Sequence, residues 1–352
     1  MAAMNATPPA DRLLLHRRQL LLAAASLGLS GCVGELSRSV RRTDPLLPPD
    51  GAFTMRDGAR LPYRVWLPPD AAGGAPGAVV LALHGFNDSR DAWEIPAPWF
   101  TRAGMALYAP DQRGFGQAPG RGYWPGGTVL VDDAAELVRQ LRARHPQSRL
   151  YLMGESMGGA VLMRLATSRG LAPPVDGYVM SAPAVWGRAE MNIFLRSSLW
   201  VAVRVAPGWS IRGGGPIQVW ASDNRAALRR LSADPLTIHD TRVATLNGLV
   251  DLMDGALAAA RDFSGPALFL YGGKDELVPD HATRAAWRAL QASGDRQARV
   301  AYYPHDYHLL LRDLGRAAPI GDALAWIRNP SSPLPSHADQ AAAAWLGGPA
   351  ES

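Results

Sequence analysis

Short apolar runs alternate along the chain with longer segments in which apolar residues recur every three or four positions. The runs predict buried strands, and the periodic segments predict amphipathic helices. Their alternation predicts an α/β fold, a mainly parallel central sheet with helices on both faces. The predicted strands are 61–67, 78–83, 105–109, 150–153, 178–181, 267–271 and 300–303, and the predicted helices are 128–145, 158–168, 281–292 and 319–328.

The N-terminal segment carries a different pattern. Three arginines precede an apolar stretch at 20–30, which is too short to span a membrane as a helix. Leu-Ser-Gly-Cys at 29–32 resembles a bacterial lipobox, and the pair Arg17 and Arg18 resembles a twin-arginine export signal. The alternatives are an uncleaved anchor helix with an incidental cysteine, or a gene model that begins upstream of the true start.

The lipobox resemblance implies that residues 1–31 are a cleaved signal and that Cys32 is lipidated. Residues 32–50 are polar and Pro-rich, as expected of a tether. We therefore expect an exported lipoprotein, anchored to a membrane of a bacterial cell envelope through the acyl chains on Cys32.

Composition narrows the class. The 352 residues are 47% hydrophobic with a formal net charge of +5, which suits one large α/β domain with an insertion. Basic residues are scattered, so we expect no nucleic-acid partner. The single cysteine excludes an internal disulfide, and neither zinc-type Cys/His pairs nor His-Glu-x-x-His occur. We expect no metal and no cofactor.

The most specific chemical signal is Gly-Glu-Ser-Met-Gly at 154–158. An apolar run precedes it and a helical pattern follows, so it matches Gly-x-Ser-x-Gly at a sharp strand-to-helix turn. Such a turn exposes a serine hydroxyl and leaves no room for side chains at Gly154 and Gly158. Ser156 is the predicted nucleophile.

A serine nucleophile needs a base and an acid that orients the base. After a nucleophile elbow, the α/β-hydrolase order places the acid behind a late strand and the histidine behind the last one. Asp275 lies four residues past the strand 267–271, and His308 precedes an apolar helical start after 300–303. We predict Asp275 and His308. The competing residues are Glu276 and Asp280 for the acid, and His305 for the base.

The tetrahedral oxyanion needs two backbone N–H donors. Met157 directly follows the nucleophile, and Phe86 follows His-Gly in the loop after the strand 78–83. We predict these two donors. His84 precedes Ser156 in the chain, so a structural role is expected for it.

Five motifs occur in an order that resembles the monoacylglycerol lipase and lysophospholipase-like branch of the α/β-hydrolases: LHGFNDS, DQRGFGQ, GESMGGA, GGKDELVP and YHLLLRDL. The resemblance runs from about Gly51 to Arg328. It implies the α/β-hydrolase fold, the triad Ser156, Asp275 and His308, and a lipophilic cap after Ala182. The lipobox and the cysteine-free body depart from the family pattern.

The stretch 184–248 breaks the alternation and is rich in bulky apolar residues. We predict a helical cap insertion there, between core segments 51–183 and 249–328. Its aromatic residues are expected either to line an acyl-chain channel or to form the cap's own small core. For any single tryptophan, the small core is the better-supported expectation. Residues 329–352 are expected to form a poorly ordered tail.

The sequence therefore predicts a serine hydrolase that cleaves carboxylic esters of lipids, such as a monoacylglycerol or lysophospholipid, through an acyl-enzyme on Ser156. A short-chain carboxylesterase, a thioesterase, or a haloperoxidase-like or peptidase reaction stays open, because a fold does not fix a reaction. A non-enzymatic alternative is an envelope lipoprotein that uses the same fold for binding.

Overall fold

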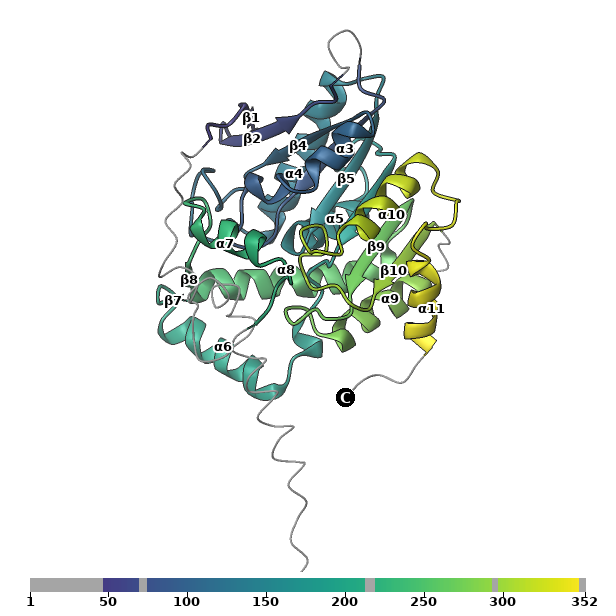
Figure 1. Ribbon diagram of the computed structural model, residues 1–352. Helices are drawn as coiled ribbons and strands as arrows, with labels where there is room; N and C mark the ends of the chain where they lie inside the picture. Colours follow the sequence, from purple (N-terminus) through teal and green to yellow (C-terminus); the bar gives the residue numbers. More distant parts are fainter. Residues whose placement is uncertain (1–46, 70–74, 213–218, 293–296, 348–352) are drawn as a thin grey trace, which may run out of the picture.

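The computed structural model describes residues 47–69, 75–212, 219–292 and 297–347 (Figure 1). The predicted signal, the lipidation site Cys32 and all but the last residues of the predicted tether lie outside this part of the chain.

One sheet of eight strands runs in the order β1-β2-β4-β3-β5-β6-β9-β10. β2 is antiparallel to both of its neighbours, and every pair from β4 to β10 is parallel, which confirms the mainly parallel sheet. The strands are β1 Gly51–Thr54, β2 Arg60–Trp66, β3 Ala78–Leu83, β4 Met105–Pro110, β5 Arg149–Glu155, β6 Gly177–Ser181, β9 Ala267–Gly272 and β10 Ala298–Tyr303.

Apolar clusters cover both faces of the sheet, as β3 shows. Its residues alternate, with Leu81 and Leu83 in one cluster and Val80 and Ala82 in the other. A strand buried on both sides reads as a continuous apolar run, which is why the sequence pattern located it. One cluster includes residues of α4 (Gly127–Arg144), α5 (Met157–Thr167), α8 (Val243–Asp262) and α9 (Asp280–Ala292), and the other includes residues of η2 (Arg90–Trp93), α3 (Ala97–Arg102) and α10 (Ala317–Arg328).

The insertion between β6 and α8 forms a small separate group of elements. It contains η3 (Arg188–Glu190), α6 (Ile193–Val205), β7 (Ser210–Arg212), α7 (Arg225–Ala233) and β8 (Asp240–Arg242). β7 and β8 pair as a short antiparallel ribbon, and α6 lies beside α8 at one side of the molecule (Figure 1).

The predicted end of the cap at residue 248 is wrong, because α8 runs without a break through that position. Gly248 sits in the contact with Trp124, where a Cβ would come within 2.2 Å of the indole Cδ1. In the described part of the chain, α8 is the one helix long and apolar enough to cross a membrane, but 61% of its apolar window is buried. It packs against α5 as a core helix of the body.

The expectation of a poorly ordered tail is wrong for residues 329–347. The helix α11 (Ala338–Gly347) packs along β10 (Figure 1). The Trp345 ring stacks on Tyr302 with centroids 4.9 Å apart, and its Nε1 donates to Asp280 Oδ1 over 2.8 Å. An alanine-rich helix has little polar contrast in sequence, and packing rather than periodicity stabilises it.

Candidate active site

Ser156 occupies the sharp turn between β5 and α5. Its φ is 53°, in the left-handed region that disfavours a residue with a side chain. A Cβ on Gly154 would lie 2.5 Å from the carbonyl carbon of Gly158, and one on Gly158 would lie 2.3 Å from Leu83 O. The two glycines thus permit the close crossing of strand and helix that holds Ser156 in this strained conformation.

Asp275 and His308 come from the loops after β9 and β10. Asp275 Oδ2 lies 2.7 Å from His308 Nδ1, and the two side chains are 0% and 1% exposed. The other carboxylate oxygen accepts hydrogen bonds from the backbone N–H groups of Leu277 and Val278, at 2.7 and 2.9 Å. The Asp275 carboxylate is therefore fixed on both of its oxygens and orients the His308 imidazole.

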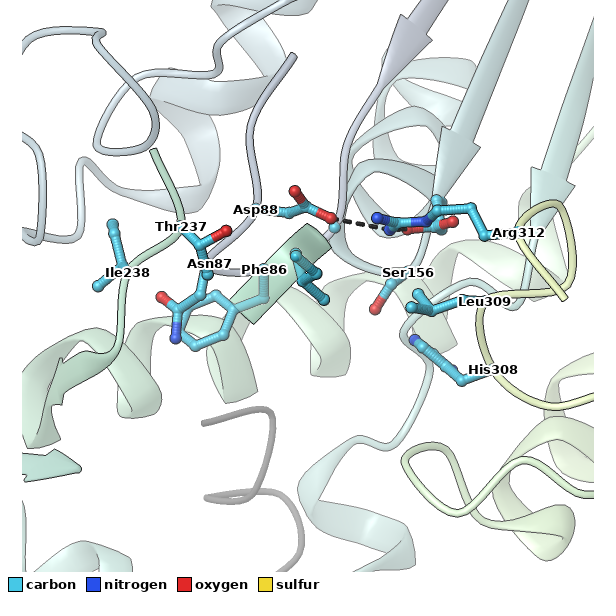
Figure 2. A pocket seen from close by; sticks show the side chains of 12 residues that line it. Phe86, Asn87, Asp88, Ser156, Thr237, Ile238, His308, Leu309 and Arg312 are labelled. Carbon is cyan, nitrogen blue, oxygen red and sulfur yellow. Dashed lines mark hydrogen bonds and ion pairs between the residues drawn. The ribbon is translucent and has the colours of Figure 1, made fainter. Parts of the chain in front are cut away.

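The second imidazole nitrogen of His308 is available for a proton from the pocket. Ser156 and His308 line the same small pocket, into which both side chains point (Figure 2). His308 Nε2 is buried and has no hydrogen-bond partner among the described residues. Burial alone lowers the pKa of His308, but the charge and hydrogen bond of Asp275, with Glu155 adding, raise the pKa above its ordinary value. Such an imidazole is a good proton acceptor for a serine hydroxyl.

The competing residues lie outside the arrangement of Ser156, Asp275 and His308. His305 and Glu276 are exposed, and Glu276 accepts a hydrogen bond from Trp220 N of the cap. Asp280 begins α9 and pairs with Arg284. His84 is fully buried, with Nε2 accepting from Gln112 N over 3.0 Å, a structural role.

The two expected oxyanion donors border the nucleophile. Met157 is the first residue of α5, where backbone N–H groups have no partner within the helix. Phe86 lines the pocket, and a Cβ on the preceding Gly85 would lie 3.3 Å from Ser156 Cβ. The loop after β3 therefore lies directly against Ser156, as the predicted oxyanion role of Phe86 requires.

Several polar residues of the pocket were not singled out from the sequence. Asn87 has a φ of 62°, and its Nδ2 donates to Thr241 Oγ1 of the cap over 2.6 Å. Asp88, Glu155 and Arg312 form a buried charged cluster beside Ser156. All four residues lie inside motifs already noted, at 83–89, 154–160 and 307–314, so their position near Phe86, Ser156 and His308 was the available signal.

An apolar cavity of about 150 Å³ lies between the cap and the core. Leu195 and Leu199 of α6 face Leu246 and Val250 of α8 across it. The cavity walls are almost wholly apolar, so it suits a hydrocarbon chain.

The cap tryptophans divide into two groups. Trp186 is buried, whereas Trp200 and Trp209 are 57% and 66% exposed. The prediction that cap aromatics form a channel or a small core is therefore wrong for Trp200 and Trp209. Ile193, Phe194, Val201 and Val205 of α6 are also exposed, so this helix presents apolar side chains to its outer side as well.

No cluster of three or more His, Cys, Asp or Glu side chains arranged to hold a metal ion occurs among the described residues. The absence of a metal or cofactor from the reaction stays a prediction.

The chain is similar in sequence to known proteins. The family model described as serine aminopeptidase, S33 matches residues 74–315. Monoacylglycerol lipase of Mycolicibacterium smegmatis is 27% identical over 284 residues, covering 78% of this chain and 95% of the relative.

Two solved structures share the fold. That of Paleococcus ferrophilus monoacylglycerol lipase superposes with a TM-score of 0.62 at 22% identity, over 76% of this chain and 98% of the other. A soluble variant of monoglyceride lipase from Saccharomyces cerevisiae, in complex with a substrate analogue, gives 0.67 at 16% identity, over 82% and 98%. The chain belongs to the serine aminopeptidase S33 family and is a monoacylglycerol lipase-like α/β-hydrolase of the carboxylic ester hydrolase class.

Proposed function

We propose that the protein hydrolyses carboxylic esters of lipids, monoacylglycerols first among them, through an acyl-enzyme on Ser156. One observation carries the proposal: the strained Ser156 shares a pocket with His308, whose other nitrogen is bound to the buried Asp275. A nucleophile, a base and an orienting acid in this chain order are the parts that acyl transfer requires.

The reaction proceeds in two halves. His308 Nε2 accepts the Ser156 proton as Oγ attacks the ester carbonyl, and the N–H groups of Phe86 and Met157 stabilise the oxyanion. His308 then gives that proton to the leaving alcohol. Water, deprotonated by the same nitrogen, hydrolyses the acyl-serine, and the proton returns to Ser156 as the acid leaves. Asp275 keeps its hydrogen bond to Nδ1 throughout and supports the imidazolium.

Two features favour a lipid acyl group. The cavity between α6 and α8 supplies an apolar space of about 150 Å³ beside the cap. The relatives named above are monoacylglycerol and monoglyceride lipases, and the similarity covers most of both chains. A lysophospholipid is the second substrate to test.

The family description raises peptide-bond cleavage as a second candidate. An aminopeptidase must bind the substrate's α-ammonium group, for which a free carboxylate is the natural partner. The two carboxylates of the Ser156 pocket, Asp88 and Glu155, are both bound to Arg312. This pairing favours the ester reaction.

We further propose that the protein works at a membrane. The support is the sequence signal at Cys32, the exposed apolar residues of α6, and the exposed Trp200 and Trp209, with the Arg204 guanidinium 3.8 Å from the Trp200 ring centroid. Exposed tryptophans flanked by arginines are typical of surfaces that contact a lipid interface. Cell fractionation tests the anchor: Cys32→Ser is expected to release the protein, and unchanged membrane association of that variant contradicts the lipidation proposal.

The substrate test compares the wild type with Ser156→Ala on a monoacylglycerol, a lysophospholipid, a short aryl ester, a thioester and an aminoacyl arylamide. Ser156-dependent acid release favouring the monoacylglycerol supports the proposal. Release from the short ester alone identifies a general carboxylesterase, and cleavage of the arylamide alone identifies a peptidase. With no release from any of them, a fluorophosphonate probe distinguishes an enzyme from a binding protein, because a binding protein has no activated serine to label.

A further inference from the structure

A single buried guanidinium links three of the four chain segments that carry the proposed catalytic groups; the fourth, after β9, carries Asp275. Arg312 lies four residues after His308, and its side chain is 7% exposed. Its Nη2 donates to Asp88 Oδ2 over 2.8 Å, marked by the dashed line in Figure 2, and also to Glu155 Oε1. Asp88 stands two residues after Phe86, and Glu155 directly precedes Ser156.

We propose that Arg312 is a positioning residue for the ester hydrolysis proposed above: it holds the oxyanion loop, the nucleophile elbow and the His308 segment together and offsets one of the two carboxylate charges beside the reacting carbonyl. The inference rests on that proposed function. Arg312 acts through Asp88, Glu155 and the loops they belong to.

The backbone around these contacts is strained and closely packed. Ser156 has a φ of 53°, a strained conformation that persists only where the surroundings enforce it, and Asn87 has a φ of 62°, a left-handed conformation that asparagine tolerates. Asp88 follows Asn87 and Glu155 precedes Ser156, so the guanidinium binds immediately beside both left-handed residues. A displacement of about 1 Å in such a site can reduce the rate by about 100-fold.

Arg312 is itself held from the cap. Its carbonyl oxygen accepts a hydrogen bond from Asn224 Nδ2 over 2.8 Å, and its N–H donates to Leu309 O over 2.7 Å. Leu309 N in turn donates to Ala221 O of the insertion over 2.9 Å. The positioning contacts therefore connect the cap to the catalytic loops through one segment.

The charges in the pocket give the same residue an electrostatic role. Asp88 and Glu155 contribute two buried negative charges, and Arg312 offsets one of them. An ester carbonyl that becomes an oxyanion in this pocket adds a further negative charge. Without Arg312, two uncompensated carboxylates would oppose that charge and disfavour the transition state.

The same charges act on His308. Three groups act on the charge of His308: Asp275 from the loop after β9, Glu155 from β5 and Arg312 from the segment of His308 itself. Asp88 is joined to them through Arg312. Two further carboxyl groups, Asp306 and Asp313, lie near His308 in the sequence. Arg312 lowers the pKa of His308, whereas Glu155 and Asp275 raise it. Removing Arg312 therefore favours the protonated imidazole, which cannot act as a base.

A stability role alone does not account for this arrangement. The free energy of desolvating a buried ion pair cancels much of its Coulomb attraction. Apolar side chains in the same site would therefore give the protein equal or greater stability. What apolar side chains cannot do is bind two carboxylates on separate catalytic loops at once. Both hydrogen bonds leave from Nη2, a cationic nitrogen with two protons, so this one group can donate to Asp88 and to Glu155 at the same time.

The experiment measures kcat and KM against pH on a soluble aryl ester for the wild type, Arg312→Met, Arg312→Lys and the double variant Arg312→Met/Glu155→Gln. Arg113→Met is the matched control, because Arg113 also lies between two carboxylates, Asp57 and Asp133, but does not line the Ser156 pocket. Thermal unfolding of each variant accompanies the kinetics.

For Arg312→Met we expect kcat to fall at least about tenfold with little change in KM, and the acidic limb of the pH profile to move up by about one unit. The double variant restores the net charge of the wild-type cluster, so its acidic limb returns while kcat stays low. Arg312→Lys keeps the positive charge, so we expect its acidic limb at the wild-type position and a smaller loss of kcat than in Arg312→Met. Arg113→Met lowers the unfolding temperature and leaves both kinetic quantities unchanged.

A folded Arg312→Met variant with wild-type kcat and pH profile overturns the proposal. So does an equal loss of kcat in Arg312→Met and Arg113→Met with no shift in the acidic limb, because that result assigns Arg312 to stability alone. Failure of the proposed function looks different: the wild type would then show no Ser156-dependent hydrolysis, whatever the Arg312 variants do.

Discussion

The Oδ2 atom of Asp275 lies 2.7 Å from Nδ1 of His308, and solvent reaches neither side chain to more than 1%. The carboxylate therefore interacts with the imidazole without screening by water, and it fixes which nitrogen faces Ser156. A charged acceptor in this position favours the imidazolium that forms when the serine gives up its proton.

Asp275→Asn is expected to reduce kcat by about 10⁴-fold with the fold intact, because the amide no longer stabilises the imidazolium or the correct tautomer. Steady-state kinetics and circular dichroism check this. The matched control is Glu276→Gln, the exposed neighbour whose carboxylate accepts a hydrogen bond from Trp220 N of the cap. If Asp275→Asn keeps more than a tenth of the wild-type kcat, the acid has been assigned wrongly.

The acidic limb of kcat/KM is expected to lie above the ordinary histidine value. His308 must be neutral to act as a base, and its pKa is raised by Asp275 and Glu155 against the effect of burial. Activity is therefore lost as the pH falls through that raised pKa. A pH–rate profile with the midpoint of this limb below about 6.5 would contradict the environment described for His308.

Asp313 makes stability depend on pH in the opposite direction from an ordinary paired carboxylate. Burial raises its pKa to about 7, against the hydrogen bonds from Ser222 and Tyr307 N. The folded state thus binds a proton at Asp313 that the unfolded chain releases near pH 4. The contribution of Asp313 to stability is therefore full below that pH and is lost as the pH rises towards 7. Unfolding temperatures between pH 5 and 8 should fall more steeply in the wild type than in Asp313→Asn. Parallel curves for the two proteins would contradict this.

The C-terminal helix is expected to contribute to stability and not to catalysis. Trp345 packs against Tyr271, Trp287 and Tyr302 and is 9% exposed. Trp345→Ala should lower the free energy of unfolding by about 3–5 kcal/mol and leave kcat unchanged. Trp200→Ala is the control, since the same deletion on an exposed side chain should cost far less. Equal denaturation midpoints for the two variants would show that α11 does not stabilise the body.

Filling the cavity between α6 and α8 should change the preference for chain length. Leu246→Trp replaces an aliphatic side chain with a larger indole ring in a space of about 150 Å³ that Leu195 and Val250 also line. We expect kcat/KM to fall at least about tenfold for long-chain monoacylglycerols and to stay constant for a short aryl ester, measured on the same preparation. An equal effect on both substrates would exclude this cavity as the acyl site.

The sequence was most informative where one local rule decides the structure. The run before Ser156 is apolar because a parallel strand is buried on both faces, and Gly154 and Gly158 are small because strand and helix cross within van der Waals contact. The same rules brought Asp275 and His308 to neighbouring loops. These features depend on chain order and burial, which a single sequence records.

Features that depend on tertiary contact were not visible. Arg312 pairs with Glu155, 157 positions away, and nothing in either local sequence reports that distance. The helix α11 is alanine-rich, so only its contact with β10 and Trp345's aromatic neighbours explain its order. Trp200 and Trp209 look like core residues by type, yet the cap leaves them exposed. Hydrophobic character predicts burial only when the partner surface is known.

The central claim is that Ser156 is an activated nucleophile that becomes acylated. Intact-mass and peptide mass spectrometry after treatment with a fluorophosphonate tests it most directly, on the wild type, Ser156→Ala and His308→Ala. The account predicts one adduct per chain on the peptide that contains Ser156, none in Ser156→Ala, and labelling slowed by several orders of magnitude in His308→Ala. An unlabelled wild type, or a wild-type adduct on any other residue, would contradict it.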